Sequence, residues 1–105
     1  MADSIKMRAT VDGDIATIKV LINHPMETGM RKGPGGQPIP AHFIEMVTVT
    51  ANGKPVMEAQ WGTAISKNPF MEFKVKGVKV GDKVAVNWVD NKGEKDSLEA
   101  AAVAK

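Results

Sequence analysis

The sequence contains no cysteine, which excludes disulfides, thiolate metal sites and cysteine nucleophiles. Aromatic residues are also few, with two tryptophans, three phenylalanines and no tyrosine. A sugar-binding accessory domain needs exposed aromatic rings, so this composition weakens that hypothesis. We expect Trp88 to be a core residue. Trp61 lies at a strand end beside Gly62, a position compatible with a role in an interface.

Neither sign of charge dominates, because 14 lysines and arginines face 12 aspartates and glutamates for a net charge of +2. No dense basic run is present to follow a phosphate backbone, and no apolar run approaches the roughly 20 residues that cross a bilayer. We therefore expect neither nucleic acid nor a membrane as a partner. Residues 1–8 lack a basic segment followed by an apolar one, which predicts no signal peptide. Taken alone, this indicates a cytoplasmic protein.

The chain has 105 residues, 43% of them hydrophobic, and we expect a single domain over residues 1–105. Short stretches of alternating apolar and polar residues, separated by turn residues, predict about seven strands. They are placed at residues 4–12, 15–23, 42–51, 56–61, 70–76, 83–90 and 94–101. Asn52-Gly53 is the strongest hairpin signal. Strands of this spacing predict an all-β, immunoglobulin-like β-sandwich.

The third strand and the C-terminal end have less regular patterns than the other strands. In the third strand, strict alternation places Val47 and Val49 on one side, and Ile44 and Met46 on the other. This pattern predicts a strand that is covered on both faces. The alanine-rich end, residues 99–105, is compatible with either a strand or a helical turn.

Residues 24–41 interrupt the strands with a long segment rich in glycine and proline, which neither a helix nor a strand ladder accommodates well. A long irregular loop in a small β domain is usually functional, because a short turn would suffice to connect the strands. We interpret it as a recognition surface for a protein partner. The residues assigned to this surface are His24, Met26, Glu27, Met30, Arg31, Ile39 and His42, with Trp61 from the loop that follows residue 60.

No convincing catalytic constellation is present. The glycines of residues 33–36 are followed by Pro38-Ile39-Pro40 rather than by a helix, so they do not form a phosphate cradle. Ser66 and Lys67 are neighbours whose side chains point to opposite faces of an extended chain, so they do not form a dyad. We therefore expect a protein without enzymatic activity and without a cofactor.

An alternative function uses the same loop as a metal site. His24, Met26, Met30 and His42 offer imidazole and thioether groups, which suit copper. A periplasmic copper-binding β-sandwich is therefore the second hypothesis. Methionines also fill irregular gaps and form adaptable surfaces, which requires no metal.

Several motifs occur at the loops and strand ends. They are His24-Pro25-Met26-Glu27-Thr28-Gly29, Ile39-Pro40-Ala41-His42-Phe43-Ile44, Trp61-Gly62, Ile65-Ser66-Lys67-Asn68-Pro69, Gly81-Asp82, Trp88 and Asp90. Over nearly the whole chain this set resembles the SoxZ family, the small subunit of the bacterial thiosulfate-oxidation carrier complex.

The resemblance implies an immunoglobulin-like sandwich that forms a heterodimer with SoxY. SoxY carries sulfur intermediates on a cysteine near the end of a flexible, glycine-rich C-terminal segment. The enzymes of the pathway dock transiently to process these intermediates. The SoxZ subunit supplies no catalytic residue. It is exported to the periplasm folded onto SoxY, which bears the signal. A subunit without cysteine acts through binding, and in isolation we expect self-association through the partner-facing surface.

Overall fold

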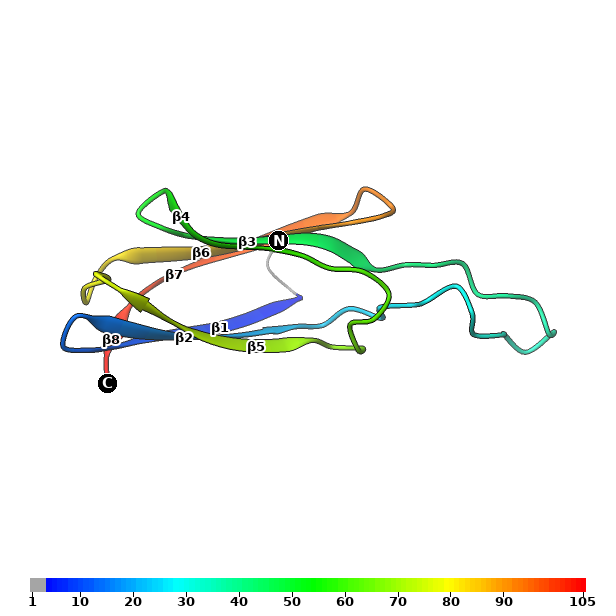
Figure 1. The fold of residues 1–105 in the computed structure, drawn as a ribbon, viewed down its shortest axis with the longest axis horizontal. Helices are drawn as coiled ribbons and strands as arrows, with labels where there is room; N and C mark the ends of the chain where they lie inside the picture. Colours follow the sequence, from blue (N-terminus) through cyan, green and yellow to red (C-terminus); the bar gives the residue numbers. More distant parts are fainter. Residues whose placement is uncertain (1–3) are drawn as a thin grey trace.

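The computed structural model describes residues 4–105 as two β-sheets packed face to face (Figure 1). The eight strands are β1 (Ile5–Asp12), β2 (Ile15–Ile22), β3 (Ile44–Ala51), β4 (Lys54–Gln60), β5 (Phe70–Lys76), β6 (Lys83–Asp90), β7 (Lys95–Ala101) and β8 (Val103–Ala104). One sheet has the order β5-β2-β1-β8 and the other the order β4-β3-β6-β7. The predicted all-β sandwich is confirmed.

The described residues contain no helix, and therefore none of the length and apolarity that would span a membrane. The alanine-rich end is a strand. β7 pairs with β6 in one sheet, and after the buried Ala102 the chain continues as β8, which runs parallel to β1 in the other. The end of the chain thus links both layers of the sandwich.

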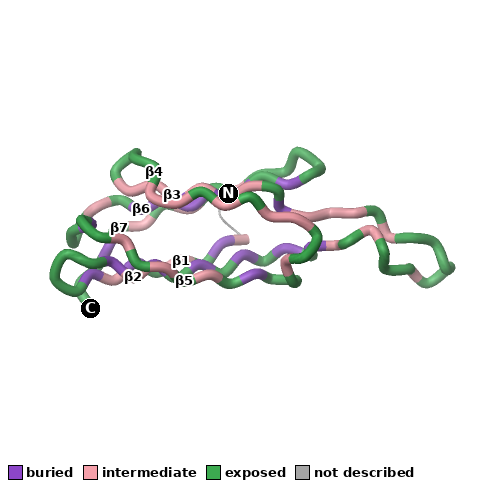
Figure 2. The backbone as a smooth tube through the Cα atoms, in the orientation of Figure 1, coloured by how far each residue is buried: buried purple, intermediate pink, exposed green. Residues whose placement is uncertain are grey.

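The core consists of the alternate residues of the inner strands, which are the buried positions in Figure 2. From β2, β3 and β6 it receives Ile18, Val20, Ile22, Val47, Val49, Val84 and Val86, all with no exposed surface. Burial of one such side chain contributes about 1.5–3 kcal/mol. β-Branched residues suit these positions because they pack well on a pleated sheet. Trp88, 7% exposed, belongs to this core as predicted.

The start of β3 departs from strict alternation. The pairing of β3 with β6 shifts between Ile44 and Met46, which is a β-bulge. The extra residue turns Ile44 inward, so that Ile44 and Val47 are both fully buried. The prediction that Ile44 lies on the side opposite Val47, together with Met46, is therefore wrong. Period-two counting fails because a bulge changes the face of every residue that precedes it.

Residues 23–43 connect β2 in one sheet with β3 in the other, and we call this connection the arm. Figure 1 shows the arm projecting beyond one end of the sandwich, along the longest axis of a molecule measuring 54 × 21 × 20 Å. The turns at the β1–β2 and β5–β6 connections lie at the opposite end. The fold therefore presents the segment singled out from the sequence as its most prominent projection.

Candidate functional site

The arm runs outward from β2 and then returns to β3, and backbone hydrogen bonds hold these two limbs together. Glu27 and His42 form a mutual pair, with N···O distances of 2.7 and 3.0 Å. Farther out, the amide of Ile39 donates to the carbonyl of Arg31 at 2.8 Å. Gly29 has a φ of +86°, and a Cβ there would lie 3.2 Å from the Cβ of Ala41, so a glycine is required where the limbs approach. The arm is an irregular hairpin rather than an open loop.

The outer part of the arm carries exposed polar and apolar side chains. The Nε of Arg31 donates to both carboxylate oxygens of Glu27, at 2.9 and 3.1 Å. This hydrogen bond is the main reason that the pKa of Glu27 lies below its usual value and the pKa of Arg31 above it. Met30 is 85% exposed. An uncharged, flexible thioether thus stands beside a paired carboxylate and guanidinium.

At the root of the arm, two histidines converge on one buried carboxylate. His24 lies three residues before Glu27, His42 is the backbone partner of Glu27, and Asp90 is the last residue of β6. The Nε2 atoms of His24 and His42 lie 3.1 and 2.7 Å from the same oxygen of Asp90, Oδ2. The side chain of Asp90 has no exposed surface, and those of His24 and His42 are 3% and 17% exposed. We call these three residues the root cluster.

Asp90 accepts four hydrogen bonds in this cluster. Besides the two imidazoles on Oδ2, the amides of Lys92 and Glu94 donate to Oδ1 at 3.0 and 2.8 Å. Burial raises the pKa of Asp90, but the hydrogen bonds from the two imidazoles and the two amides outweigh it and lower the pKa below its usual value. Asp90 is therefore an ionised, fully hydrogen-bonded anion that joins the arm to the β6–β7 hairpin.

The hydrogen bonds of His24 define its tautomer. Its Nδ1 lies 3.1 Å from the amide nitrogen of Met26, which can only donate. Nδ1 therefore carries no proton, and the proton of the neutral ring is on Nε2, from which it is donated to Asp90. The ring also makes edge contacts with His42 and Trp88, at centroid distances of 4.6 and 5.2 Å. Both nitrogens of His24 are used inside the protein.

The root cluster has ligand atoms within 4.8 Å of one another, a spacing compatible with a metal ion. The chemistry of His24 does not fit one. A metal on Nε2 requires the proton on Nδ1, where it would face the amide proton of Met26. The copper set predicted from the sequence is not assembled either, because the Sδ of Met26 accepts the amide of Ile44 at 3.3 Å and Met30 points into solvent. The geometry does not support the copper alternative.

Comparison with known families gives one finding. The family model described as sulphur oxidation protein SoxZ matches residues 5–101. The chain belongs to the SoxZ family. No curated protein matches the chain. Membership assigns this SoxZ-family chain to the sulfur-oxidation (Sox) system, in a family of carrier subunits that is not known as catalytic.

The SoxZ-family arm divides the predicted contact residues into two groups. His24 and Met26 are buried, at 3% and 4% exposure, so their side chains offer a partner almost no surface. Trp61, partly buried, packs against the core. The others that remain accessible are Glu27, Met30, Arg31, Ile39 and His42, of which Met30 and Arg31 are the most exposed, at 85% of the residue and 67% of the side chain. That these residues contact a partner stays a prediction.

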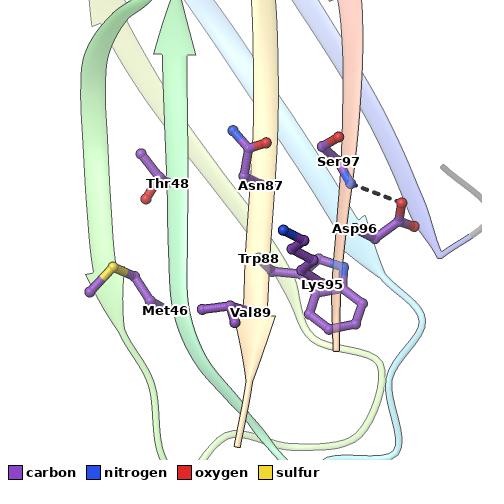
Figure 3. A pocket seen from close by; sticks show the side chains of 8 residues that line it. All are labelled: Met46, Thr48, Asn87, Trp88, Val89, Lys95, Asp96 and Ser97. Atoms are coloured by element: carbon purple, nitrogen blue, oxygen red, sulfur yellow. Dashed lines mark hydrogen bonds between the residues drawn. The ribbon is translucent and has the colours of Figure 1, made fainter. Parts of the chain in front are cut away.

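Among the hollows on the surface of this SoxZ-family subunit, two are large. One, of about 580 Å³, lies between the arm and the loop after β4, and its lining includes Glu27, Arg31 and Lys67. The other, of about 480 Å³, lies on the outer face of the β4-β3-β6-β7 sheet (Figure 3). Its lining residues are Met46, Thr48, Asn87, Trp88, Val89, Lys95, Asp96 and Ser97. Lys95 and Asp96 are the two charged residues of this lining. Sequence reasoning did not find this second surface.

The carboxylate of Asp90 also makes stability depend on acid. Because its pKa is lower in the folded than in the unfolded chain, Asp90 contributes stability that is complete above the unfolded value of about 3.9 and is lost as the pH falls through the lower folded value. We expect the carboxyl carbon of Asp90, followed by NMR, to titrate below pH 3.9, with loss of the root-cluster hydrogen bonds in the same range. A titration midpoint above 3.9 would contradict this account.

Proposed function

We propose that this chain is the non-catalytic scaffold subunit of the SoxYZ sulfur carrier. It binds SoxY and helps to present the intermediates bound to a SoxY cysteine to the thiosulfate-oxidising enzymes. The observation that carries the proposal is the family match over residues 5–101 in a chain without cysteine. Because no thiol is present to hold sulfur, the covalent attachment belongs to the partner.

The proposed partner also suggests the compartment in which the subunit works. We propose that the subunit works in the periplasm and reaches it already folded onto SoxY, which bears the export signal. A rigid two-layer core is suited to this task, because a carrier visited by several enzymes needs a stable platform with adaptable contact surfaces. Exposed methionines such as Met30 provide adaptability, because the thioether repacks against different partners.

The direct test is co-purification. SoxY and this chain are co-expressed with a tag on SoxY alone, and a stable 1:1 complex is expected, with about 1,600 Å² or more buried between the subunits. Mass spectrometry after incubation with thiosulfate and the loading enzyme should find the adduct on SoxY only. A folded chain that ignores SoxY, or that itself carries an adduct or turns over thiosulfate, would refute the proposal.

Met30→Glu tests the arm as a contact surface. Met30 is 85% exposed, so the substitution should leave the melting temperature unchanged. If Met30 lies in a desolvated contact, a buried carboxylate there should weaken binding of SoxY or of a docking enzyme by about 10- to 100-fold. Calorimetric titration against each protein measures the effect.

Val80→Glu is the matched control, because Val80 is 59% exposed and lies in the β5–β6 turn at the end of the sandwich opposite the arm. We expect this variant to bind as the wild type does. Equal binding by both variants would remove Met30 from the interface, and unfolding of Met30→Glu would contradict its assignment to the surface.

A further inference from the structure

Met26, at the root of the arm, has an unusual backbone. Its φ is +48°, in the left-handed region that L-residues with a side chain rarely adopt. Such a conformation persists only where surrounding contacts impose it. Two contacts do so here: the amide of Met26 donates to Nδ1 of His24 at 3.1 Å, and its Sδ accepts the amide of Ile44 at 3.3 Å.

The first of these contacts depends on the charge of His24. A neutral His24 has one nitrogen available to accept a proton, Nδ1, because Nε2 already carries the proton donated to Asp90. Protonation would place an N–H on Nδ1 directly opposite the N–H of Met26, so the hydrogen bond would be replaced by a contact between two donors. The ring is buried, so solvent offers no alternative arrangement.

The groups around the His24 ring determine which of its two hydrogen bonds breaks on protonation, the one to Asp90 or the one to Met26. His24 faces the carboxylate of Asp90, the ring of His42 and the uncharged edge of Trp88. The carboxylate of Glu94 lies 3.3 Å from Nε2 of His42, and that of Glu27 is paired with Arg31. A charged His24 binds ionised Asp90 more strongly. The ring therefore stays attached to β6, and the contact that opens is the one to Met26 and the arm.

We propose that His24 is a proton-sensitive latch, whose protonation at Nδ1 releases Met26 from its left-handed conformation and loosens the root of the arm. Histidine is the side chain whose charge ordinarily changes between about pH 5 and 8. The residue pair that follows Met26, Glu27 with His42, is the first backbone link between the two limbs. Release of Met26 therefore acts where the whole arm is aligned. That the loosened arm alters partner binding rests on the proposed function, but the release itself does not.

The test uses the full chain and NMR between about pH 7.5 and pH 4.5, a range in which imidazoles titrate. At the upper limit the ring-nitrogen shifts of His24 should report a proton on Nε2 alone. As His24 gains its second proton, hydrogen-exchange protection of the Glu27, Ile39 and His42 amides should fall by about tenfold. The Gly81 and Ala102 amides, bonded at the other end of the sandwich, should keep theirs.

Two variants separate the histidines, since the chain has only two. His24→Gln cannot gain a charge, and arm protection should become independent of pH. His42→Gln leaves His24 as the one imidazole and should retain the pH-dependent loss. The proposal is overturned if the loss disappears in His42→Gln, or if wild-type His24 carries its proton on Nδ1 at neutral pH. It also fails if His24 becomes charged while arm protection stays constant, a wild-type result that decides the question even where His24→Gln does not fold.

SoxY binding, measured at both pH values, is a separate readout. Failure to bind at either pH counts against the proposed function, whereas the exchange data on the chain alone decide the latch. Addition of Zn²⁺ at neutral pH should leave the His24 ring-nitrogen shifts unchanged. A zinc-induced shift of its Nε2 would show a metal site in place of a latch.

Discussion

Asp90→Asn is expected to lower the free energy of unfolding by about 3–6 kcal/mol, because at least two donors lose a hydrogen bond to a charged acceptor, each worth about 1.5–3 kcal/mol. The substitution keeps the shape of the side chain but not its chemistry. All four groups around Asp90 are donors, two imidazoles and two backbone amides. An asparagine offers them one acceptor oxygen, and its own NH₂ group then faces donors on the other side. At least two of these N–H groups lose their acceptor.

Urea unfolding at neutral pH measures this loss. Asp12→Asn is the matched control, because Asp12 is 78% exposed and its ion pair with Lys105 spans 3.8 Å. Exposed pairs contribute about 0–1 kcal/mol, so the control should differ from the wild type by no more than that. If the two variants are equally stable, Asp90 does not act as the anion of the root cluster. Loss of exchange protection in the arm should accompany the destabilisation of Asp90→Asn.

The strands of this sandwich are encoded locally in the sequence, whereas the bulge and the pairing of the arm depend on long-range contacts. Alternation and turn residues together locate the seven longer strands to within two residues at each end, because a two-layer sandwich buries one face of each strand. Alternation places Ile44 on the wrong side, since the sequence carries no mark of the bulge between Ile44 and Met46. The arm was predicted as irregular, but the sequence did not show that its limbs pair, because the Glu27–His42 link depends on tertiary contacts.

The root cluster could be predicted only in part for the same reason. His24 and His42 attracted attention by their chemistry, yet the acceptor that joins them is Asp90, 66 residues from His24 along the chain. Nothing local marks Asp90 except that it ends an alternating strand at a position where an apolar residue would be buried. The position of Met26 in a loop predicts that it belongs to a recognition surface. The structure buries it, since its Sδ and its amide both have partners at the root.

Trp88→Ala is expected to have an effect of similar size, about 3–5 kcal/mol, because it leaves a large cavity between the sheets. Trp88 is 7% exposed and pairs with Val47 across β3 and β6. Its Nε1 donates to the hydroxyl of Ser4 at 3.1 Å, and that hydroxyl donates in turn to Asp96 at 2.6 Å. The ring edge also contacts His24. The side chain thus supports both the core and the root of the arm.

Trp88→Phe separates these roles. Phenylalanine retains most of the apolar volume and loses the N–H group, and since Ser4 keeps its bond to Asp96, we expect a loss of only about 1 kcal/mol beyond a small packing term. Chemical unfolding followed by the fluorescence of Trp61, then the only tryptophan, measures both variants. Equal losses in the two variants would mean that the hydrogen bond to Ser4 matters more than the volume of the ring. A much larger loss of stability in Trp88→Ala than in Trp88→Phe would assign the effect to packing. The arm amides of Trp88→Ala should then lose exchange protection as well, because the ring that contacts His24 has been removed.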